Sequence, residues 1–439
     1  MLAAILLALA AHAAPANDAS GIQWIEDDYD AAAAKAAAAG TPVFVDLWAT
    51  WCHSCLSMKR YVFTDAGMKR AAGDAVFAAL DQELPKNRAF VAKYPVDGLP
   101  TFLLLDPKTG QVISRWLGSG TVADLRSFVV HGREQLQAMR GGKLSEALQA
   151  AQAGDEAQLQ ENNDAAARAY EKAFQLSAEG DWYRPQLLGK LLTAWRRQHT
   201  PEALKSCVTV GLQQMEKLGR SAVAADAASG VAGCAEELKA DPSSKPALEK
   251  ALAVLLAVAS DESAPMSADD RSDALGSATG LLDDAGRHPE AVKAAEKRRE
   301  ILLAAQKAAP DFEMASTFDP HLAETYLYLK QAPLAEAMLT RREKEMPDDY
   351  NPPARLARVL LEQGKSQQAE AAIDRALKIA PQGPRKVGLY GLKEKIAKAL
   401  GKPVEPVLRE ELALMETLPK TLRRPKAEER IKAQLAKKE

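Results

Sequence analysis

The pattern of hydrophobic and polar positions divides the chain into a mixed part and a purely helical part. Between about residues 20 and 131, short apolar runs alternate with amphipathic stretches, and residues 42–48 form an almost continuous apolar run. Such a run is typical of a strand buried on both faces. After about residue 142 only helical periodicity remains. We therefore expect an α/β domain over residues 17–140, followed by an all-α domain over residues 141–439.

The predicted elements of the first part follow one another in the order of an α/β fold. The strand at 42–48 contains one polar residue, Asp46, and a helix begins at the two cysteines that follow it. Two further helices are predicted at 29–39 and 122–131, and further strands at 75–80, 101–105 and 112–117. A hairpin turn at 106–110 joins the last two strands. This alternation predicts a sheet covered by helices.

The second part contains an internal repeat. Small and helix-breaking residues recur after about 34 residues, which is the period of tetratricopeptide repeats. The later copy contains Ala357, Gly364, Ala369, Ala376 and Pro381, and the earlier copy contains Ala323, Ala335 and Pro347. Lys330 and Arg342 depart from the pattern in the earlier copy. We therefore expect a tetratricopeptide-like solenoid of irregular helical hairpins.

The composition narrows the classes of partner. Lys and Arg number 57 and Asp and Glu number 59, so the net charge is -2 and the basic footprint of a nucleic-acid-binding protein is missing. Aromatic residues make up 5% of the chain while Ala runs recur, which favours helix-on-helix packing. We expect proteins or small molecules as partners, and no nucleic acid.

The N-terminus predicts export. Residues 2–11 form an apolar run of signal-peptide length, and small residues follow at 11–13 and 14–16. We assign residues 1–16 to a signal peptide, which implies a periplasmic or secreted protein in an oxidising space. No later apolar run reaches the roughly 20 residues that a membrane-spanning helix needs.

Two cysteines directly follow the buried strand, in the sequence Trp51-Cys52-His53-Ser54-Cys55. Cys52 lies at the start of the predicted helix, where the positive end of the helix dipole stabilises a thiolate. Cys55 lies three residues further on, so the pair can close and reopen a small disulfide. We predict Cys52 as the exposed nucleophile and Cys55 as the resolving thiol, and a protonated His53 would lower the pKa of Cys52 further. An alternative of equal weight is that His53 is an ordinary solvent-exposed polar residue that does not tune the pair.

Two cysteines at this spacing are also half of a zinc site. The other two cysteines, Cys207 and Cys234, lie far away in the helical part, and no histidine cluster completes four ligands. We therefore predict no metal and no cofactor.

The active-site motif resembles that of the thioredoxin superfamily. Residues 45–55 are similar to the thioredoxin active-site strand and loop, and residues 99–101 to its cis-proline loop. Residues 61–65, together with the spacing of the Gly-Leu-Pro-Thr motif, are most similar to the C-terminal periplasmic domain of the thiol:disulfide interchange reductase DsbD. The resemblance covers residues 22–131.

The resemblance implies roles for two further residues. Asp46 corresponds to the buried carboxylate that moves the proton of Cys55, and Pro100 to the cis-proline that faces the disulfide. Trp51 is a candidate for tuning the redox pair, with ordinary packing as an equal alternative. The His53-Ser54 dipeptide differs from the Gly-Pro of thioredoxin, so the direction of the redox reaction stays open, with reduction favoured.

Two functions fit the sequence. The first is a thiol:disulfide oxidoreductase that acts on protein disulfides, with the solenoid recruiting substrates and an electron donor or acceptor protein, membrane-bound or not, recharging the pair. The second is a tetratricopeptide-like scaffold or holdase whose Cys52–Cys55 pair stays oxidised as a structural staple.

The remaining two cysteines predict a structural disulfide. Cys207 lies in the predicted helix at 201–218 and Cys234 in the predicted helix at 221–239, with a Gly219-centred turn midway between them. The two residues therefore lie level across an antiparallel hairpin. In an oxidising compartment we expect a bridge, with two buried free thiols as the alternative.

Overall fold

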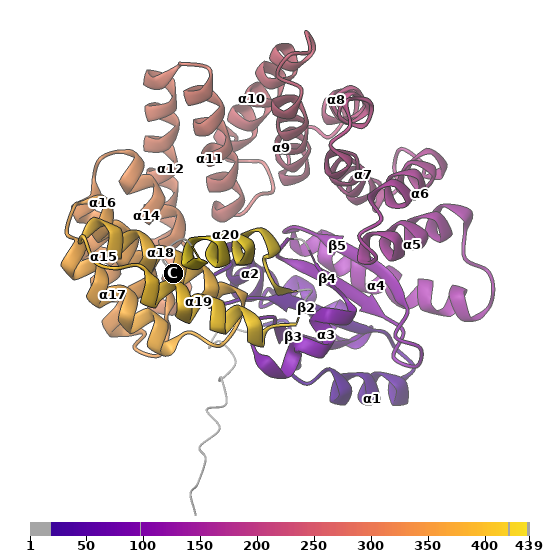
Figure 1. Ribbon diagram of the computed structural model, residues 1–439. Coiled ribbons are helices and arrows are strands. Elements are labelled where there is room, and N and C mark those ends of the chain that lie inside the picture. Colours follow the sequence, from indigo (N-terminus) through magenta and orange to yellow (C-terminus); the bar gives the residue numbers. More distant parts are fainter. Residues whose placement is uncertain (1–18, 97, 420–421, 437–439) are drawn as a thin grey trace, which may run out of the picture.

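The computed structural model describes residues 19–96, 98–419 and 422–436. The predicted signal peptide, residues 1–16, lies outside the described residues. An α/β domain comes first and a long series of helices follows it, so the predicted fold class is confirmed (Figure 1).

Five strands form one mixed sheet in the order β1-β3-β2-β4-β5. They are β1 (Trp24–Glu26), β2 (Val43–Trp48), β3 (Val76–Asp81), β4 (Thr101–Leu105) and β5 (Val112–Leu117). Strands β1, β3 and β2 run parallel, and β4 and β5 are each antiparallel to their predecessor in the sheet. The sequence missed β1, because three residues are too few to show a pattern. Strand β2 lies in the centre, which explains its almost continuous apolar run.

Helices cover both faces of this sheet. They are α1 (Tyr29–Ala39), α2 (His53–Ser57), α3 (Arg88–Lys93) and α4 (Val122–Arg140), with a π-helical segment η1 (Met58–Val62) and 3-10 segments at Ala66–Gly73 and Pro85–Asn87. Because side chains alternate along a strand, Val45 of β2 packs in the cluster with α1 and α3, whereas Phe44 joins the aromatic rings of the opposite face. Helix α4 continues beyond the predicted end at residue 131.

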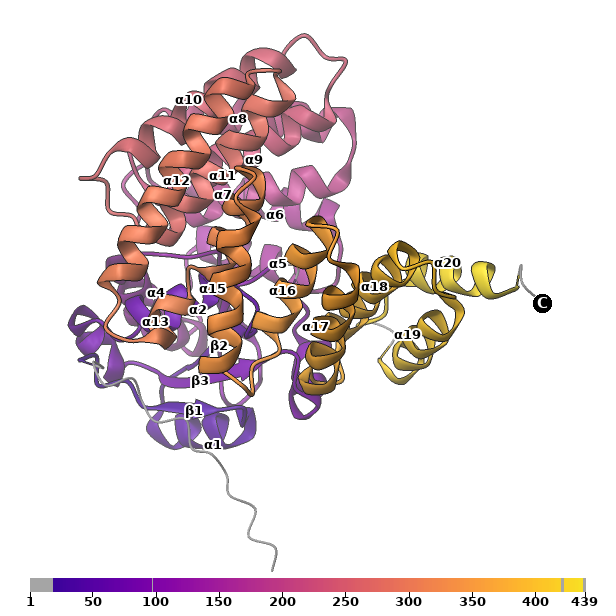
Figure 2. The same cartoon turned by 90° about the vertical axis from the view of Figure 1, so that its left-hand side faces the viewer.

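The second part is a solenoid in which each helix packs against its neighbours in sequence. Its helices are α5 (Glu146–Leu159), α6 (Asn163–Leu176), α7 (Arg184–Gln198), α8 (Pro201–Met215), α9 (Ala222–Glu237), α10 (Ser244–Ser260), α11 (Ala268–Asp284), α12 (His288–Ala308), α13 (Phe312–Ser316), α14 (Asp319–Tyr328), α15 (Ala332–Glu345), α16 (Asn351–Glu362), α17 (Ser366–Ile379), α18 (Pro384–Ala399), α19 (Glu405–Thr417) and α20 (Pro425–Ala436). Figures 1 and 2 show that they form an arc that starts beside β5 and returns to α2.

The predicted repeat corresponds to helical hairpins. Ala357 of α16 and Ala369 of α17 are fully buried where the two helices meet, and Gly364 joins the helices with a φ of 73°. Such a left-handed conformation favours glycine. In the earlier copy, the turn after α14 places Lys330 in the same region at a φ of 58°. The departure at Lys330 therefore keeps the backbone geometry of the turn at the cost of strain.

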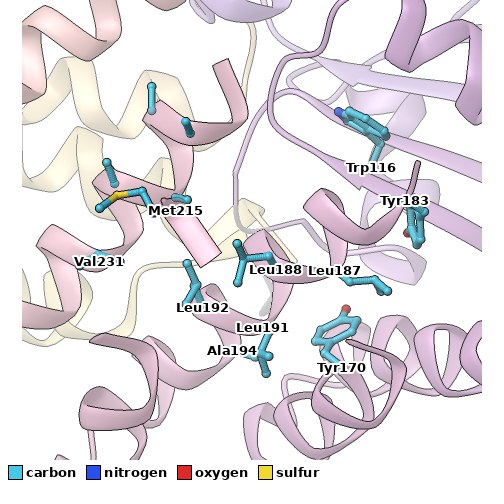
Figure 3. Close-up of a cluster of buried hydrophobic side chains, with 14 of the residues drawn as sticks. Trp116, Tyr170, Tyr183, Leu187, Leu188, Leu191, Leu192, Ala194, Met215 and Val231 are labelled. Carbon is cyan, nitrogen blue, oxygen red and sulfur yellow. The ribbon is translucent and has the colours of Figure 1, made fainter. Parts of the chain in front are cut away.

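The hydrophobic core continues from the sheet into the solenoid. One cluster of buried side chains extends from Phe44 through Trp116 of β5 to Leu187 and Leu188 of α7, and onwards to α12. Figure 3 shows Trp116 and the leucine side chains of α7, which belong to this one cluster. The first solenoid helices and the sheet therefore pack around one shared core.

Charged side chains are buried where the solenoid begins. Asp155 of α5 accepts hydrogen bonds from Lys190 of α7 at 2.8 Å and from Arg115 of β5 at 3.4 Å. The hydroxyl of Tyr170 also donates to Asp155, at 2.8 Å. Removing one partner of a buried pair leaves an uncompensated charge, which costs about 3–5 kcal/mol. This network therefore holds α5 and α7 in a defined position on β5.

A disulfide lies inside the solenoid. Cys207 of α8 and Cys234 of α9 are bonded, with their Cα atoms 6.3 Å apart, and both side chains are fully buried. The bond joins two neighbouring antiparallel helices.

Replacing Cys207 and Cys234 together by Ala should lower the free energy of unfolding of the full chain by about 3–4 kcal/mol. The bridge spans a sequence separation of 27 residues, and closing a loop of that length restricts the unfolded chain. Denaturant unfolding of the wild type and the double variant measures the difference. Peptide mapping without reductant is the control, and unlinked Cys207 and Cys234 peptides would contradict the bridge.

Candidate redox site

The redox pair is positioned by the end of β2. The chain leaves the strand at Trp48, and Cys52 forms the N-cap of α2, where its Sγ accepts a hydrogen bond from the backbone N–H of Cys55 at 3.1 Å. Cys52 and Cys55 are joined by a disulfide, with their Cα atoms 5.2 Å apart. The sulfur of Cys52 therefore lies at the end of α2 whose free N–H groups stabilise a thiolate once the bond is reduced.

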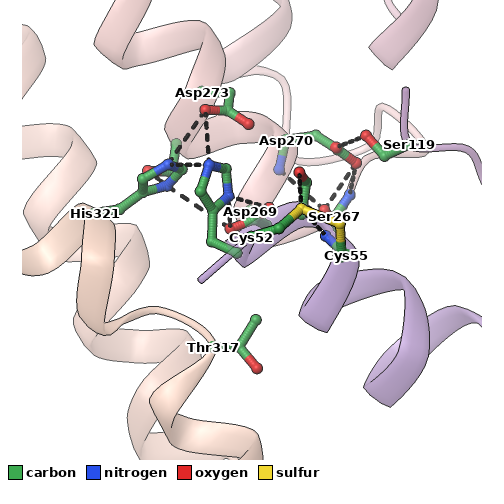
Figure 4. A network of polar contacts seen from close by, with 12 residues as sticks. Cys52, Cys55, Ser119, Ser267, Asp269, Asp270, Asp273, Thr317 and His321 are labelled. Carbon is green, nitrogen blue, oxygen red and sulfur yellow. Dashed lines mark hydrogen bonds and ion pairs between the residues drawn. A yellow bond between two sulfur atoms is a disulfide. The ribbon is translucent and has the colours of Figure 1, made fainter. Parts of the chain in front are cut away.

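Both cysteines are buried. Cys52 is 4% exposed and Cys55 is fully enclosed, so the prediction of an exposed Cys52 was wrong. Ala49, Trp51 and Leu99 pack around the pair, and α11 of the solenoid packs directly against α2. At the same edge, Ser119 of the loop after β5 donates to Asp270 of α11 at 2.6 Å, as Figure 4 shows beside the disulfide.

Pro100 lies at the same end of the sheet as the redox pair. The peptide bond between Leu99 and Pro100 is cis, and Thr101 begins β4 and pairs with Leu47 of β2. Leu99 packs against the cluster formed by Ala49 and the two cysteines. The structure thus brings this loop and the disulfide together.

Asp46 is the buried carboxyl of the site. It is fully enclosed, and neither carboxylate oxygen has a hydrogen-bond partner among the described residues. Burial raises the pKa of Asp46 to about 7, against the opposing charge of Lys59. A carboxyl with this pKa can take up and release a proton near neutral pH, as the predicted role of a proton carrier requires.

Trp51 lies between the two parts of the chain. Its indole N–H donates to Glu83 at 3.4 Å, its backbone carbonyl accepts a hydrogen bond from Arg355 of α16 at 3.3 Å, and the guanidinium of Arg385 lies 5.4 Å from its ring centroid. These contacts tie the active-site loop to α16 and α18. A tuning role for Trp51 stays a prediction.

His53 also contacts the solenoid. Its Nδ1 lies 2.9 Å from an oxygen of Asp269 in α11, and its Nε2 lies 3.1 Å from Nε2 of His321 in α14. Burial lowers the pKa of His53, but the hydrogen bond to Asp269 and the negative charge of that residue outweigh it, so the pKa is raised overall. His53 therefore has a specific ionic partner close to the redox pair.

Comparison with known proteins assigns the first part of the chain. Residues 24–107 match a family model described as thioredoxin-like. These residues form a thioredoxin-like domain. The cis-proline loop, the buried Asp46 and the disulfide all lie within the matched segment.

The chain is also similar to proteins named thiol:disulfide interchange protein DsbD. It is 33% identical to that of Ralstonia nicotianae over 93 residues, which cover 21% of this chain and 15% of the relative. It is 35% identical to that of Pseudoalteromonas atlantica over 82 residues, 18% of this chain and 14% of the relative. The chain therefore spans about 15% of the length of these relatives. A solved tetratricopeptide repeat protein from Parabacteroides merdae shares 16% identity over 66% of this chain and 98% of its own, with a TM-score of 0.41.

Three residues beside the redox pair were not predicted from the sequence. Asp269 and Asp273 lie on α11, which begins at a capping box of Ser267 and Asp270, and His321 lies on α14. The sequence predicted no metal site, yet the structure brings His53, Asp273 and His321 within reach of a single ion. The only signal in the sequence is the spacing of Asp269 and Asp273, which places both on one face of a helix.

Replacing Asp46 by Asn should change how the stability of the chain depends on pH. The pKa of Asp46 rises from 3.8 to about 7 on folding, so between these values the folded protein binds more protons than the unfolded chain. The wild type therefore loses stability through Asp46 as pH rises from about 4 to about 7, and the variant lacks this contribution. A shift of about three pKa units corresponds to about 4 kcal/mol between pH 4 and pH 8. Denaturant unfolding at several pH values measures it.

Asp30→Asn is the control for this experiment, because Asp30 is an exposed carboxylate in the first turn of α1. The stability of this variant should follow that of the wild type at every pH. Parallel curves for the wild type and Asp46→Asn would contradict a buried carboxyl that titrates near neutral pH.

Proposed function

We propose that this chain is a periplasmic thiol:disulfide oxidoreductase that uses its Cys-His-Ser-Cys pair on the disulfides of other proteins. The observation that carries the proposal is the closed Cys52–Cys55 disulfide at the start of α2 in a thioredoxin-like domain. The names of the relatives, thiol:disulfide interchange proteins, support the same chemistry. Asp46, with its pKa of about 7, supplies the acid–base group.

In the favoured direction the pair reduces its substrate. The thiolate of Cys52 attacks one sulfur of a substrate disulfide and forms a mixed disulfide, while the other substrate sulfur leaves as a thiolate. Asp46 then accepts the proton of Cys55, whose thiolate attacks Cys52. The Cys52–Cys55 bond closes and the second substrate thiolate leaves. Two electrons pass to the substrate, and an electron donor protein must reduce the pair again.

A periplasmic location has two supports. The chain contains two disulfides, which persist in oxidising compartments, and its N-terminus predicts a signal peptide. Across residues 19–96, 98–419 and 422–436, none of the helices combines the length and the apolar character needed to cross a membrane.

The solenoid is proposed to select what reaches the pair. Arg60, from η1, hydrogen-bonds the carbonyl of Glu313 and the hydroxyls of Ser316, at 3.0 Å, and Thr317, at 2.9 Å. Together with the contacts of His53 to α14 and of Trp51 to α16 and α18, this fastens the solenoid next to the active-site loop. A protein substrate requires these contacts to open, so the solenoid both recruits and restricts partners.

The burial of Cys52 favours a second candidate function. A disulfide enclosed to this degree also fits a structural staple, with the solenoid acting as a scaffold or holdase. The two functions differ in whether Cys52 forms mixed disulfides with other proteins.

Replacing Cys55 by Ser should trap substrates on Cys52. Without the resolving thiol the mixed disulfide persists, so covalent adducts should accumulate that disappear on adding reductant. Non-reducing gels of the full chain, expressed with export to the periplasm, detect them. Cys52→Ser/Cys55→Ser is the matched control and should trap nothing. Absence of adducts from Cys55→Ser, with Cys52 shown to be a free thiol, would favour the scaffold.

Replacing Arg60 by Ala should make the disulfide easier to reach. Losing the contacts to α13 lowers the free energy that holds the solenoid against the active-site loop by about 1–2 kcal/mol. This corresponds to an approximately 5- to 30-fold faster reduction of Cys52–Cys55 by a protein reductant. Stopped-flow measurement of the two reduction rates tests this. Arg133→Ala is the control, because Arg133 pairs with Asp74 inside the thioredoxin-like domain at 2.9 Å. Equal rates for the wild type and Arg60→Ala would contradict the gating role.

A further inference from the structure

Two imidazole rings from distant parts of the chain meet beside the redox pair. Nε2 of His53 lies 3.1 Å from Nε2 of His321, and Oδ1 of Asp273 lies 4.0 Å from the first nitrogen and 3.3 Å from the second. Figure 4 shows the Asp273 carboxylate next to the ring of His321. Two nitrogen lone pairs at this separation repel each other unless a proton or a cation lies between them.

The other ring nitrogens already have partners. Nδ1 of His53 lies 2.9 Å from Asp269, and Nδ1 of His321 lies 2.7 Å from the hydroxyl of Ser272. A proton on each Nδ1 leaves Nε2 of both rings free to accept. Metal-binding histidines are held in this way, with the outer nitrogen donating to a carboxylate or another oxygen.

The two Nε2 atoms and Oδ1 of Asp273 have the spacing of the ligand atoms in a transition-metal site. The circle that passes through them has a radius of about 2 Å, which matches the bond lengths of Zn²⁺ to imidazole nitrogen and carboxylate oxygen. The ring centroids lie 3.8 Å apart at an angle of 51°, so the rings must turn apart slightly for both lone pairs to converge on an ion. Three protein ligands leave a fourth position open, as in catalytic zinc sites.

The surroundings allow a cation to enter and to be held. The side chain of His321 is 4% exposed, whereas that of Asp273 is 50% exposed and connects the site with solvent. Asp269 and Asp273 bring negative charge to the site. The positive charge of nearby Arg298 is partly offset by the carboxylate of Glu324, which lies 3.7 Å from the Arg298 guanidinium. Nitrogen and oxygen ligands of this kind suit Zn²⁺ and similar divalent ions.

We propose that His53, His321 and Asp273 form a binding site for a divalent transition-metal ion of the Zn²⁺ class. The ligands come from α2, α14 and α11, so the bound ion joins the thioredoxin-like domain to the solenoid one residue away from Cys52. The site goes beyond the proposed oxidoreductase function and does not depend on it.

Calorimetric titration of the oxidised full chain with Zn²⁺, after treatment with a chelator, tests the site. The closed Cys52–Cys55 disulfide keeps the thiols from binding the metal. We expect one Zn²⁺ per chain. Asp269→Asn should weaken Zn²⁺ binding about 10- to 100-fold, the range typical of a residue that hydrogen-bonds a metal ligand without touching the metal. His321→Ala removes a ligand and should weaken binding by more. Co²⁺ should give the visible bands of a tetrahedral site, and these should be lost in His321→Ala.

The controls separate this site from loose surface binding. His288→Ala removes an exposed histidine of α12 whose Nδ1 lies 2.8 Å from Asp283, and it should leave binding unchanged. Asp273→Asn alters a half-exposed side chain, so it tests the site even where His321→Ala does not fold. Zn²⁺ affinity that is unchanged in Asp273→Asn and His321→Ala, or binding that occurs only after reduction of the cysteines, would overturn the proposal.

Discussion

The buried charge network of Asp155 in α5, Lys190 in α7 and Arg115 in β5 holds the two parts of this chain in one arrangement. Asp155 lies 2.8 Å from Lys190 and 3.4 Å from Arg115, and all three side chains are almost completely buried. Because each solenoid helix packs mainly on its neighbours, the position of α5 and α7 on the sheet sets the direction of the whole arc. The arc then returns to the sheet at α2. A pair buried beside β5 therefore decides what lies over the disulfide at the other side of the domain.

The return of the arc gives the thioredoxin-like domain an unusual setting for its chemistry. The disulfide, the cis-proline loop and the buried Asp46 are local features of the domain. Next to them, Arg60, Trp51 and His53 make contacts with the solenoid, which we propose control access to the disulfide. The energy of each of those contacts is modest, since one hydrogen bond to a charged group contributes only about 1.5–3 kcal/mol. A closed resting state that opens for selected partners is consistent with interactions of this strength.

The proposed ion site lies within the same contact region. If His53 and His321 shared an ion in place of a proton, the ion would add bonds between the two parts of the chain next to Cys52. Metal binding and disulfide exchange would then both depend on the contact region between α2, α11 and α14. The solenoid would thus be joined to the redox site by metal–ligand bonds as well as by packing.

The sequence by itself determined the elements and their local chemistry. The apolar run of β2, the cysteine spacing at the start of α2 and the repeat of small residues are short-range patterns, and each follows from the period of a strand or helix. Tertiary structure decided the rest: that Cys52 is buried, that Asp269 and His321 meet His53, and that three-residue β1 completes the sheet. His53 and His321 are separated by 268 residues, and no local period relates them. Their distance depends on the summed geometry of every helix in between, which only the folded arc supplies.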